Sequence, residues 1–400
     1  MKRIIVAGEF FGATWTRISV LALALGLAST AGPAIAQTSS SRAEEAATVV
    51  EVTARDHDAA KNVIARGIHT AGTGRIEGGR NPPKTFKANK AGALEEISTS
   101  GRSTTTRTEA LAGTAAAAAP AFAGPGFYPD DLVQSSPPGP VITDALVYNL
   151  FINCDGSCFV STGYSDTPGK FLNRFFVSDF IHLLDQYTGT TQSGRYRGNG
   201  AIVEQYAIQS AHLDDATDIA AILHSAATNY GTGYNVIYNV FVPQGIDVCI
   251  STSTGLQCFS PNNPANWTFC AYHSYVDFPD IGHVLYTVIP YPDQALISGG
   301  LPMYVCDVGQ TNPNSNTTPT PNGVVADSVA SFLDHELSEI ITDPDLNAYL
   351  VQNSLADYLS EIGDVCVNPG FLYMPFAVSG TPYYIQPEYS NTYHACATVP

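Results

Sequence analysis

The chain is 400 residues long, contains eight cysteines and carries a formal net charge of −18 at pH 7. A protein this acidic repels nucleic acid and anionic membrane surfaces, so we exclude both as partners. From residue 126 onward there are 4 Lys and Arg against 26 Asp and Glu, which places the acidity in the C-terminal two-thirds.

The first 36 residues have the features of a cleavable signal peptide. A basic start and an apolar run at 18–27 precede Ala-Ile-Ala at 34–36, which is a small-x-small cleavage pattern. No later stretch stays apolar for the ~18 residues that a membrane anchor needs. We therefore expect a secreted protein, extracellular or periplasmic, without a membrane anchor and with a mature chain that begins at Gln37.

All eight cysteines follow the signal segment, and an even number in an exported chain favours disulfides over a metal ribbon. The spacing leaves the connectivity open. Pairing in sequential order is the simplest pattern: Cys154 with Cys158, Cys249 with Cys258, Cys270 with Cys306, and Cys366 with Cys396.

Residues 37–125 are rich in Ala, Ser, Thr and Gly and nearly free of aromatic side chains. A segment of this composition buries little core, so we interpret it as a disordered linker, with a pro-segment as the alternative. It has room for one amphipathic helix near Ala43–Ala65. Aromatic and β-branched residues become dense from Phe127, and we place one folded domain at 126–400.

Strands and helices alternate along this domain, which predicts an α/β (α+β) fold: a single disulfide-stapled domain with a twisted mixed sheet. Hydrophobic patterns predict strands at 145–154, 201–208, 235–242, 267–276 and 283–289. They predict helices at 170–187, 213–228 and 324–342, the last of which stops at Asp343-Pro344.

The helix predicted at 324–342 carries ionisable side chains where it should be buried. On a helical wheel, Glu336 and Glu339 fall inside or on the border of the apolar stripe, and His335 lies at its edge. Carboxylates aimed at a core are costly unless they are paired or bind a cation. The opposite face, which we expect to be exposed to solvent, holds Asp327, Ser331, Asp334 and Ser338.

His335 and Glu339 are four residues apart and project from one face of the helix, a spacing that lets two side chains bind one ion. The segment His-Glu-Leu-Ser-Glu at 335–339 has the layout of the zincin helix H-E-x-x-H, with Glu in place of the second His. In such sites the metal lowers the pKa of a bound water, and the adjacent Glu, here Glu336, takes its proton. We therefore expect a zincin-like active-site helix.

A third ligand is expected downstream. Glu361 lies 22 positions after Glu339, as in His-His-Glu zinc enzymes, and Asp364 could orient the His335 ring from the second shell. The metal expected at His335, Glu339 and Glu361 is Zn2+, although so many oxygen donors are also compatible with Mn2+ or Ca2+. His273 could line the cleft, but a single strand histidine is more often structural.

An alternative needs no metal, because Glu336 and Glu339 could pair with basic residues. The domain offers only Lys170, Arg174, Arg195 and Arg197, so we favour the metal site. Other catalytic signals are weaker: there is no G-x-S-x-G motif for a serine hydrolase, and His224, inside a predicted helix, has no obvious partner.

Several segments resemble one known family, in order and over about residues 139–396. They read GPVI at 139–142, NVIYNVFVP at 235–243, FCAYH at 269–273, DHELSEIITDP at 334–344, and EIGDVC at 361–366. This combination is similar to the EXORDIUM, or phosphate-induced protein 1, family and its bacterial relatives. The resemblance implies a secreted protein, linked in plants to cell-wall growth and signalling, but no defined activity.

Relatives of that family usually carry Ser where this chain has Asp334. We expect the difference to be tolerated, because that position is predicted to face solvent. The function expected first is a secreted metal-dependent hydrolase, in particular a zincin-like peptidase acting on a peptide or cell-wall substrate. The alternative is a non-catalytic extracellular protein of EXORDIUM type with a structural or relic metal site. The oligomeric state is left open.

Overall fold

The structure is a computed structural model that describes residues 48–63, 65–72, 85–88, 94–97, 131–154, 168–252, 255–263, 267–292, 295–296, 302–303, 306, 321–351, 361–366 and 374–400. The signal peptide predicted at 1–36 lies outside these ranges. None of the helices in them is both long and apolar enough to cross a bilayer.

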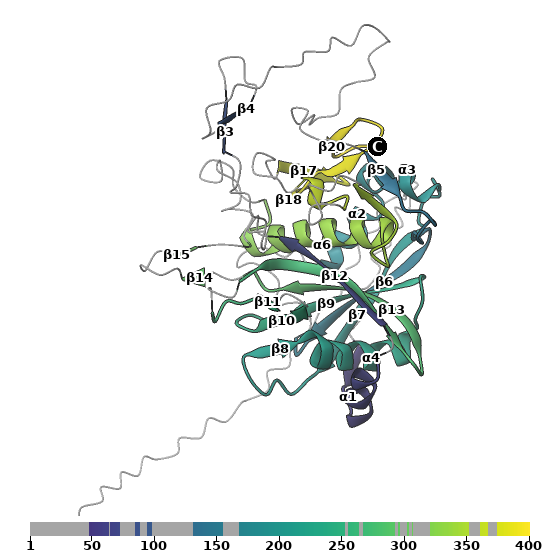
Figure 1. The fold of residues 1–400 in the computed structure, drawn as a ribbon, viewed down its shortest axis with the longest axis vertical. Helices are drawn as coiled ribbons and strands as arrows, with labels where there is room; N and C mark the ends of the chain where they lie inside the picture. Colours follow the sequence, from purple (N-terminus) through teal and green to yellow (C-terminus); the bar gives the residue numbers. More distant parts are fainter. Residues whose placement is uncertain are drawn as a thin grey trace, which may run out of the picture. The chain divides into compact units, whose positions relative to one another are not determined.

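A seven-stranded mixed sheet is the main element, with the order β1-β7-β6-β9-β13-β12-β2 (Figure 1). The strands β1, β7, β6, β9 and β13 run parallel to one another, and β12 is antiparallel to both of its neighbours. The predicted α/β class with a mixed sheet is thus confirmed. The bounds are β1 Thr48–Glu51, β2 Ala65–Gly72, β6 Ala145–Ile152, β7 Tyr196–Gln205, β9 Val236–Val242, β12 Phe269–Phe278 and β13 Gly282–Pro290.

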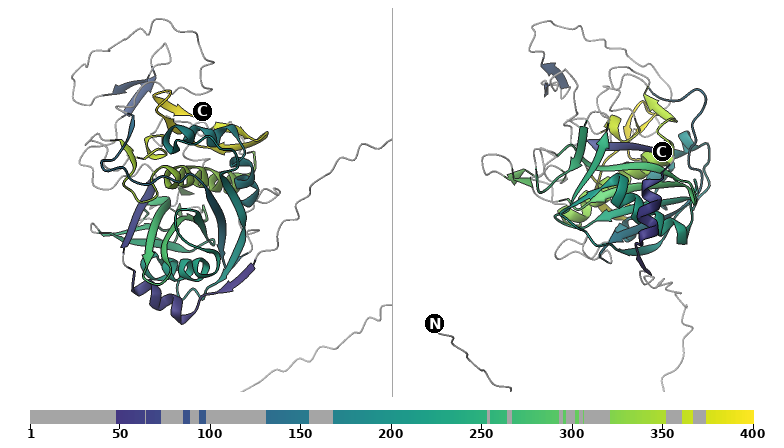
Figure 2. Two further views of the ribbon diagram at one scale, coloured as in Figure 1. Left: turned by 90° about the vertical axis from the view of Figure 1, so that its right-hand side faces the viewer. Right: turned by 60° about the horizontal axis from the view of Figure 1, so that its bottom comes forward.

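Helices cover both faces of the sheet (Figures 1 and 2). The helix α6, Val324–Thr342, packs on one face against β12 and β13, and its bounds are those predicted from the sequence. The helix α4, Ala220–Tyr230, lies on the other face after one π-helical turn, Asp215–Ile219. With both faces covered, a central strand such as β9 buries every residue.

A further layer covers the side of α6 that faces away from the sheet. The helix α2, Pro168–Phe175, and the hairpin of β17, Met374–Val378, with β18, Thr381–Ile385, contact α6 there (Figure 2). The prediction that the second face of α6 is exposed is therefore wrong, because this layer excludes solvent from it. The buried residues of that face are Asp327, Ser331, Asp334 and Ser338.

Asp327 illustrates how this second face is satisfied. Its carboxylate accepts hydrogen bonds from the backbone N–H of Tyr384 on β18 at 3.1 Å and from the backbone N–H of Asn322 at 3.0 Å. A carboxylate in the first turn also suits the positive end of the helix dipole. The side chain thus links the start of α6 to the covering hairpin.

The N-terminal segment differs from the predicted linker. Residues 48–72 add β1 beside β7, the helix α1, Ala54–Lys61, and β2 beside β12. In place of the predicted helix near Ala43–Ala65 there are a strand, a shorter helix and a second strand. Pairing with the two edges of the sheet overrides the weak strand propensity of this segment.

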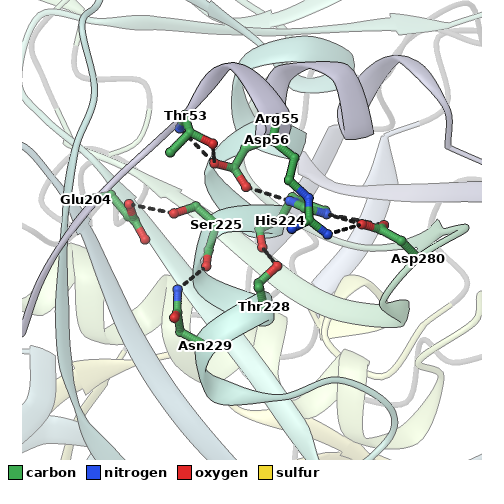
Figure 3. A network of polar contacts seen from close by, with 9 residues as sticks. All are labelled: Thr53, Arg55, Asp56, Glu204, His224, Ser225, Thr228, Asn229 and Asp280. Atoms are coloured by element: carbon green, nitrogen blue, oxygen red, sulfur yellow. Dashed lines mark hydrogen bonds and ion pairs between the residues drawn. The ribbon is translucent and has the colours of Figure 1, made fainter.

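The helix α1 is attached to α4 by a buried polar network, shown in Figure 3. Nδ1 of His224 lies 2.6 Å from the Asp56 carboxylate, and its Nε2 lies 3.1 Å from that of Asp280. Thr53 donates two hydrogen bonds to Asp56, one from its backbone N–H and one from its hydroxyl. His224, for which the sequence suggested no partner, therefore has one on each ring nitrogen.

The remaining elements are short. The helix predicted at 170–187 is broken after α2 into a 3-10 helix, Asp179–Leu184, and the turn α3, Asp185–Thr188, because Ser178 is extended. The small sheets are formed by β3 Thr85–Ala88, β4 Leu94–Ile97, β5 Leu132–Gln134, β8 His212–Asp214, β10 Asp247–Thr252, β11 Gly255–Phe259, β14 Ala295–Leu296, β15 Pro302–Met303, β16 Tyr349–Val351, β19 Glu388–Ser390 and β20 Ala395–Ala397.

Three of the four suggested cysteine pairs are present as disulfides, and the fourth, Cys154 with Cys158, includes a residue outside the described ranges. The bond between Cys366 and Cys396 attaches the short 3-10 helix η5, Asp364–Cys366, to β20. The other two bonds join Cys249 with Cys258 and Cys270 with Cys306.

Candidate metal centre

Among the buried ionisable side chains of α6, Glu336 and Glu339 lie near β12 of the sheet, and His335 lies near Asp364. His335 is 3% exposed, and Glu336 and Glu339 are completely buried. Nε2 of His335 lies 3.0 Å from Oε1 of Glu339, one turn later on the helix. The predicted pairing of these two side chains on one helical face is therefore present in the structure.

The sheet contributes His273, at the middle of β12. Its Nδ1 lies 3.4 Å from Oε2 of Glu336 and 3.3 Å from Oε2 of Glu339. The neighbouring Tyr272 points to the opposite face, where its hydroxyl donates to Asp215. Because alternate residues of a strand face opposite sides, His273 is directed toward α6.

The short segment before Cys366 supplies two more carboxylates. Oε1 of Glu361 lies 3.5 Å from Nε2 of His273, and Oδ1 of Asp364 lies 3.6 Å from Nε2 of His335. The backbone N–H of Asp364 donates to Oε1 of Glu339 at 3.1 Å, which holds the segment against α6. Both side chains are buried.

Gly363 permits this close approach. A Cβ at that position would lie 2.5 Å from Nδ1 of His335 and 2.9 Å from Oε1 of Glu339. Neither atom can withdraw easily, because both belong to buried side chains. Any larger residue would therefore push the Glu361–Asp364 segment away from the helix.

Gln386, after β18, contacts the ring of His335 on its other side. Its Oε1 lies 3.3 Å from Nδ1, and its Nε2 donates to the backbone carbonyl of Gly363 at 2.7 Å. A proton on Nδ1 of His335 would satisfy Gln386 and leave Nε2 as the donor atom for an ion. The sequence predicts that Asp364 orients the His335 ring, but Asp364 lies on the Nε2 side, and Gln386 occupies the orienting position at Nδ1.

Burial and charge act in opposite directions on the histidines. Burial alone would lower the pKa of His273, but the carboxylates of Glu361, Glu336 and Glu339 raise it to about 10. The pKa of His335 is likewise raised well above its usual value, against the effect of burial, by Glu339, Glu336 and Asp364. Burial raises the pKa of Glu336, an effect that the two histidines oppose.

Three of the four basic residues suggested as alternative partners have contacts elsewhere. Arg195 pairs with Asp185, and Arg197 pairs with Asp144. Arg174 donates to the hydroxyl of Tyr383. The partners of these three arginines are therefore not the carboxylates around His273 and His335.

The buried groups could hold a metal ion. Two sets place one donor atom from each residue within 4.8 Å of the others: His273, Glu339 and Glu361, and His335, Glu339 and Asp364. All five side chains are buried. The structure thus brings together every residue named from the sequence, but it divides them differently from the predicted set of His335, Glu339 and Glu361.

Comparisons with family models, with curated proteins and with solved structures find no match. The resemblance to the EXORDIUM family therefore stays a prediction from the motifs. The function has to be inferred from the buried cluster itself.

Two features of the cluster had little or no sequence signal. Gln386 is a single polar residue in the short connection between β18 and β19, and only the fold places it beside His335. His273 is the first of four buried polar residues that lie opposite one another on adjacent strands. The sequence does not show that these residues are neighbours, because that depends on the register of the strands. This polar row continues through Thr287, Asn239 and Asn149, with hydrogen bonds of 2.9 and 3.1 Å between the last three.

Proposed function

We propose that this protein is a secreted metal-dependent hydrolase whose divalent ion is bound between α6 and the segment Glu361–Asp364. The observation that supports it most is that His335 and Glu339, one turn apart on a buried helix, face the carboxylate of Asp364. Glu336 lies next to this group with both oxygens buried and without a hydrogen-bond partner among the described residues.

The side chains present fit a divalent ion. Nε2 of His335 is buried and, in the described part of the chain, accepts or donates no hydrogen bond, although two carboxylate oxygens lie within 4 Å. Imidazole and carboxylate atoms that converge in this way on one buried point are the arrangement that an ion requires. Imidazole and carboxylate donors suit Zn2+, and the oxygen-rich set also suits Mn2+ or Ca2+.

An ion bound here would supply a water of lowered pKa as the nucleophile. The residues of the chain would do the rest. Glu336 would accept the proton of the attacking water and return it to the leaving group, so that water is added across the broken bond. Because burial raises the pKa of Glu336, its carboxyl group can hold that proton between the two steps.

The proposed substrate class is a peptide or a cell-wall polymer outside the cytoplasm. The signal segment predicted at 1–36 supports export, and three disulfides are compatible with an extracellular protein. A zincin-like peptidase is the finer form of the proposal, and its support is the H-E-x-x-E segment of α6.

A second candidate is a non-catalytic extracellular protein of EXORDIUM type that keeps the ion for stability. The observation that favours it is burial, because His273, His335 and the carboxyl side chains described around them are each at most 3% exposed. A structural ion is closed off by its ligands, whereas a catalytic ion needs an open position for water or substrate.

Metal analysis and a peptide-library digest of the purified chain test the proposal. We expect bound divalent metal in the wild type, and His335→Ala or Glu339→Ala should lose it and melt at a lower temperature. Glu336→Gln should keep the metal and nearly all of the stability but lose hydrolysis.

The matched control is Glu204→Gln, which removes a buried carboxylate on β7 outside the cluster and should leave the metal content unchanged. An inactive wild type that contains metal would support the structural candidate instead. A wild type purified without chelators and free of metal would refute both.

A further inference from the structure

We propose that the cluster binds two divalent ions, with the carboxylate of Glu339 bridging them. This inference rests on the proposed metal binding but goes beyond it, because the sequence motif describes a single ion. The first ion would be held by His273, Glu339 and Glu361, and the second by His335, Glu339 and Asp364.

The carboxylate of Glu339 lies between the two histidines. Its Oε2 lies 3.3 Å from Nδ1 of His273 on the sheet, and its Oε1 lies 3.0 Å from Nε2 of His335 on the helix. Each oxygen therefore faces a different imidazole. A carboxylate that presents one oxygen to each side is suited to bridge two ions about 3.5–4 Å apart, the separation found in two-metal sites.

A separate carboxylate lies near each of the two imidazoles. Oε1 of Glu361 lies 3.5 Å from the ring of His273, and Oδ1 of Asp364 lies 3.6 Å from that of His335. In each set of three, the donor atoms lie within 4.8 Å of one another. Glu339 is the residue that the two sets share.

The net negative charge of the buried cluster also favours two ions over one. The carboxylates of Glu336, Glu339, Glu361 and Asp364 carry four negative charges when ionised, in a region that excludes water. With neutral histidines, one divalent ion would leave a net charge of −2 on this group of carboxylates, and net charge is costly to bury away from water. Two divalent ions balance these four, and the buried carboxyl groups of Asp334 and Glu388 next to them add no positive charge that could replace an ion.

A fourth observation shows that the two sides are built separately. His335 is oriented by Gln386, which contacts its Nδ1 at 3.3 Å. His273 lies on β12, whose polar row continues through Thr287 directly opposite it. Since different elements hold the two imidazoles in place, a substitution that removes one ion should leave the ligands of the other ion in position.

The test is the metal stoichiometry of the full mature chain, measured by native mass spectrometry and elemental analysis after equilibration with Zn2+ or Mn2+. We expect two ions per chain in the wild type and one each in Glu361→Gln and Asp364→Asn. Glu339→Gln, which removes the bridge, should bind fewer than one. In the Mn2+-loaded wild type, electron paramagnetic resonance should show a spin-coupled pair that both single-site variants lose.

The control is Glu204→Gln, which should keep two ions. One ion in the wild type would overturn the two-ion proposal and leave the proposed function standing. No ion in the wild type would refute the proposed function itself. Because the wild-type count alone decides between these outcomes, a variant that fails to fold does not prevent the test.

Discussion

Glu204, on β7, is a buried carboxylate outside the candidate metal centre. Burial raises its pKa to about 8, and the nearby charge of Asp56 adds to the increase. Its nearest hydrogen-bonding group is the hydroxyl of Ser225, at 3.5 Å. Because the folded pKa lies above the usual value of 4.5, folding keeps a proton on Glu204 that the unfolded chain loses. Stability therefore falls as the pH rises from about 4.5 toward 8.

Replacing this carboxylate should stabilise the protein at alkaline pH. We expect Glu204→Gln to match the wild type near pH 4.5 and to be more stable by roughly 2–4 kcal/mol above about pH 8, since the amide has no proton to lose. Urea unfolding at both pH values measures the difference. An equal effect at the two values would show that ionisation of Glu204 is not the cause.

A buried, ionised carboxylate, Asp56, helps to attach the helix α1 to α4. Burial alone would raise the pKa of Asp56, but hydrogen bonds from Thr53 and the contact with His224 lower it below 3.8. The lowered pKa means that ionised Asp56 stabilises the fold above pH 3.8, and this contribution is lost as the pH falls through the folded pKa. The network in Figure 3 is therefore an attachment that acts at neutral pH.

Asp56→Asn should lower the free energy of unfolding by about 1–3 kcal/mol at neutral pH, because the buried His224 loses one of its two carboxylate partners. The matched control is Asp58→Asn on the same helix, whose side chain is 73% exposed and pairs with Lys61. Thermal melts of both variants measure the difference. An equal effect of the two changes would contradict the role assigned to the network.

Two C-terminal segments pack on α6: the strand β18 covers the helix, and the segment Glu361–Cys366 contributes side chains to the candidate metal centre. Cys366 follows Asp364 by two residues, and its disulfide to Cys396 joins the metal-centre segment to β20. The disulfide between Cys249 and Cys258 joins β10 to β11, outside the cluster. These two bonds allow stability and metal binding to be separated in one experiment.

Removal of either disulfide should cost about 2–4 kcal/mol of stability, because each limits the freedom of the unfolded chain. Only the Cys366→Ser, Cys396→Ser variant should also bind metal more weakly, since of the two disulfides this is the one attached to the segment that carries Asp364. Calorimetric titration with Zn2+ compares it with the Cys249→Ser, Cys258→Ser control. The same metal affinity in both would show that the bond does not position the centre.

Local patterns in the sequence were sufficient for much of the fold. The bounds of α6 follow from its periodicity and from Pro344, and β6, β9, β12 and β13 follow from runs of β-branched and aromatic residues. The i, i+4 spacing of His335 and Glu339 also predicted that these two side chains lie together in the candidate metal centre, because side chains four residues apart share a helical face.

Other features depended on segments that are far apart in the chain. The strand β2 has little strand propensity and forms because β12 offers an unpaired edge. The face of α6 that holds Asp334 is polar and yet buried, because α2 and the hairpin of β17 and β18 cover it. The places of His273 and Gln386 in the centre arise in the same way. A side chain's partners across layers depend on strand register and layer packing, neither of which leaves a local pattern in the sequence.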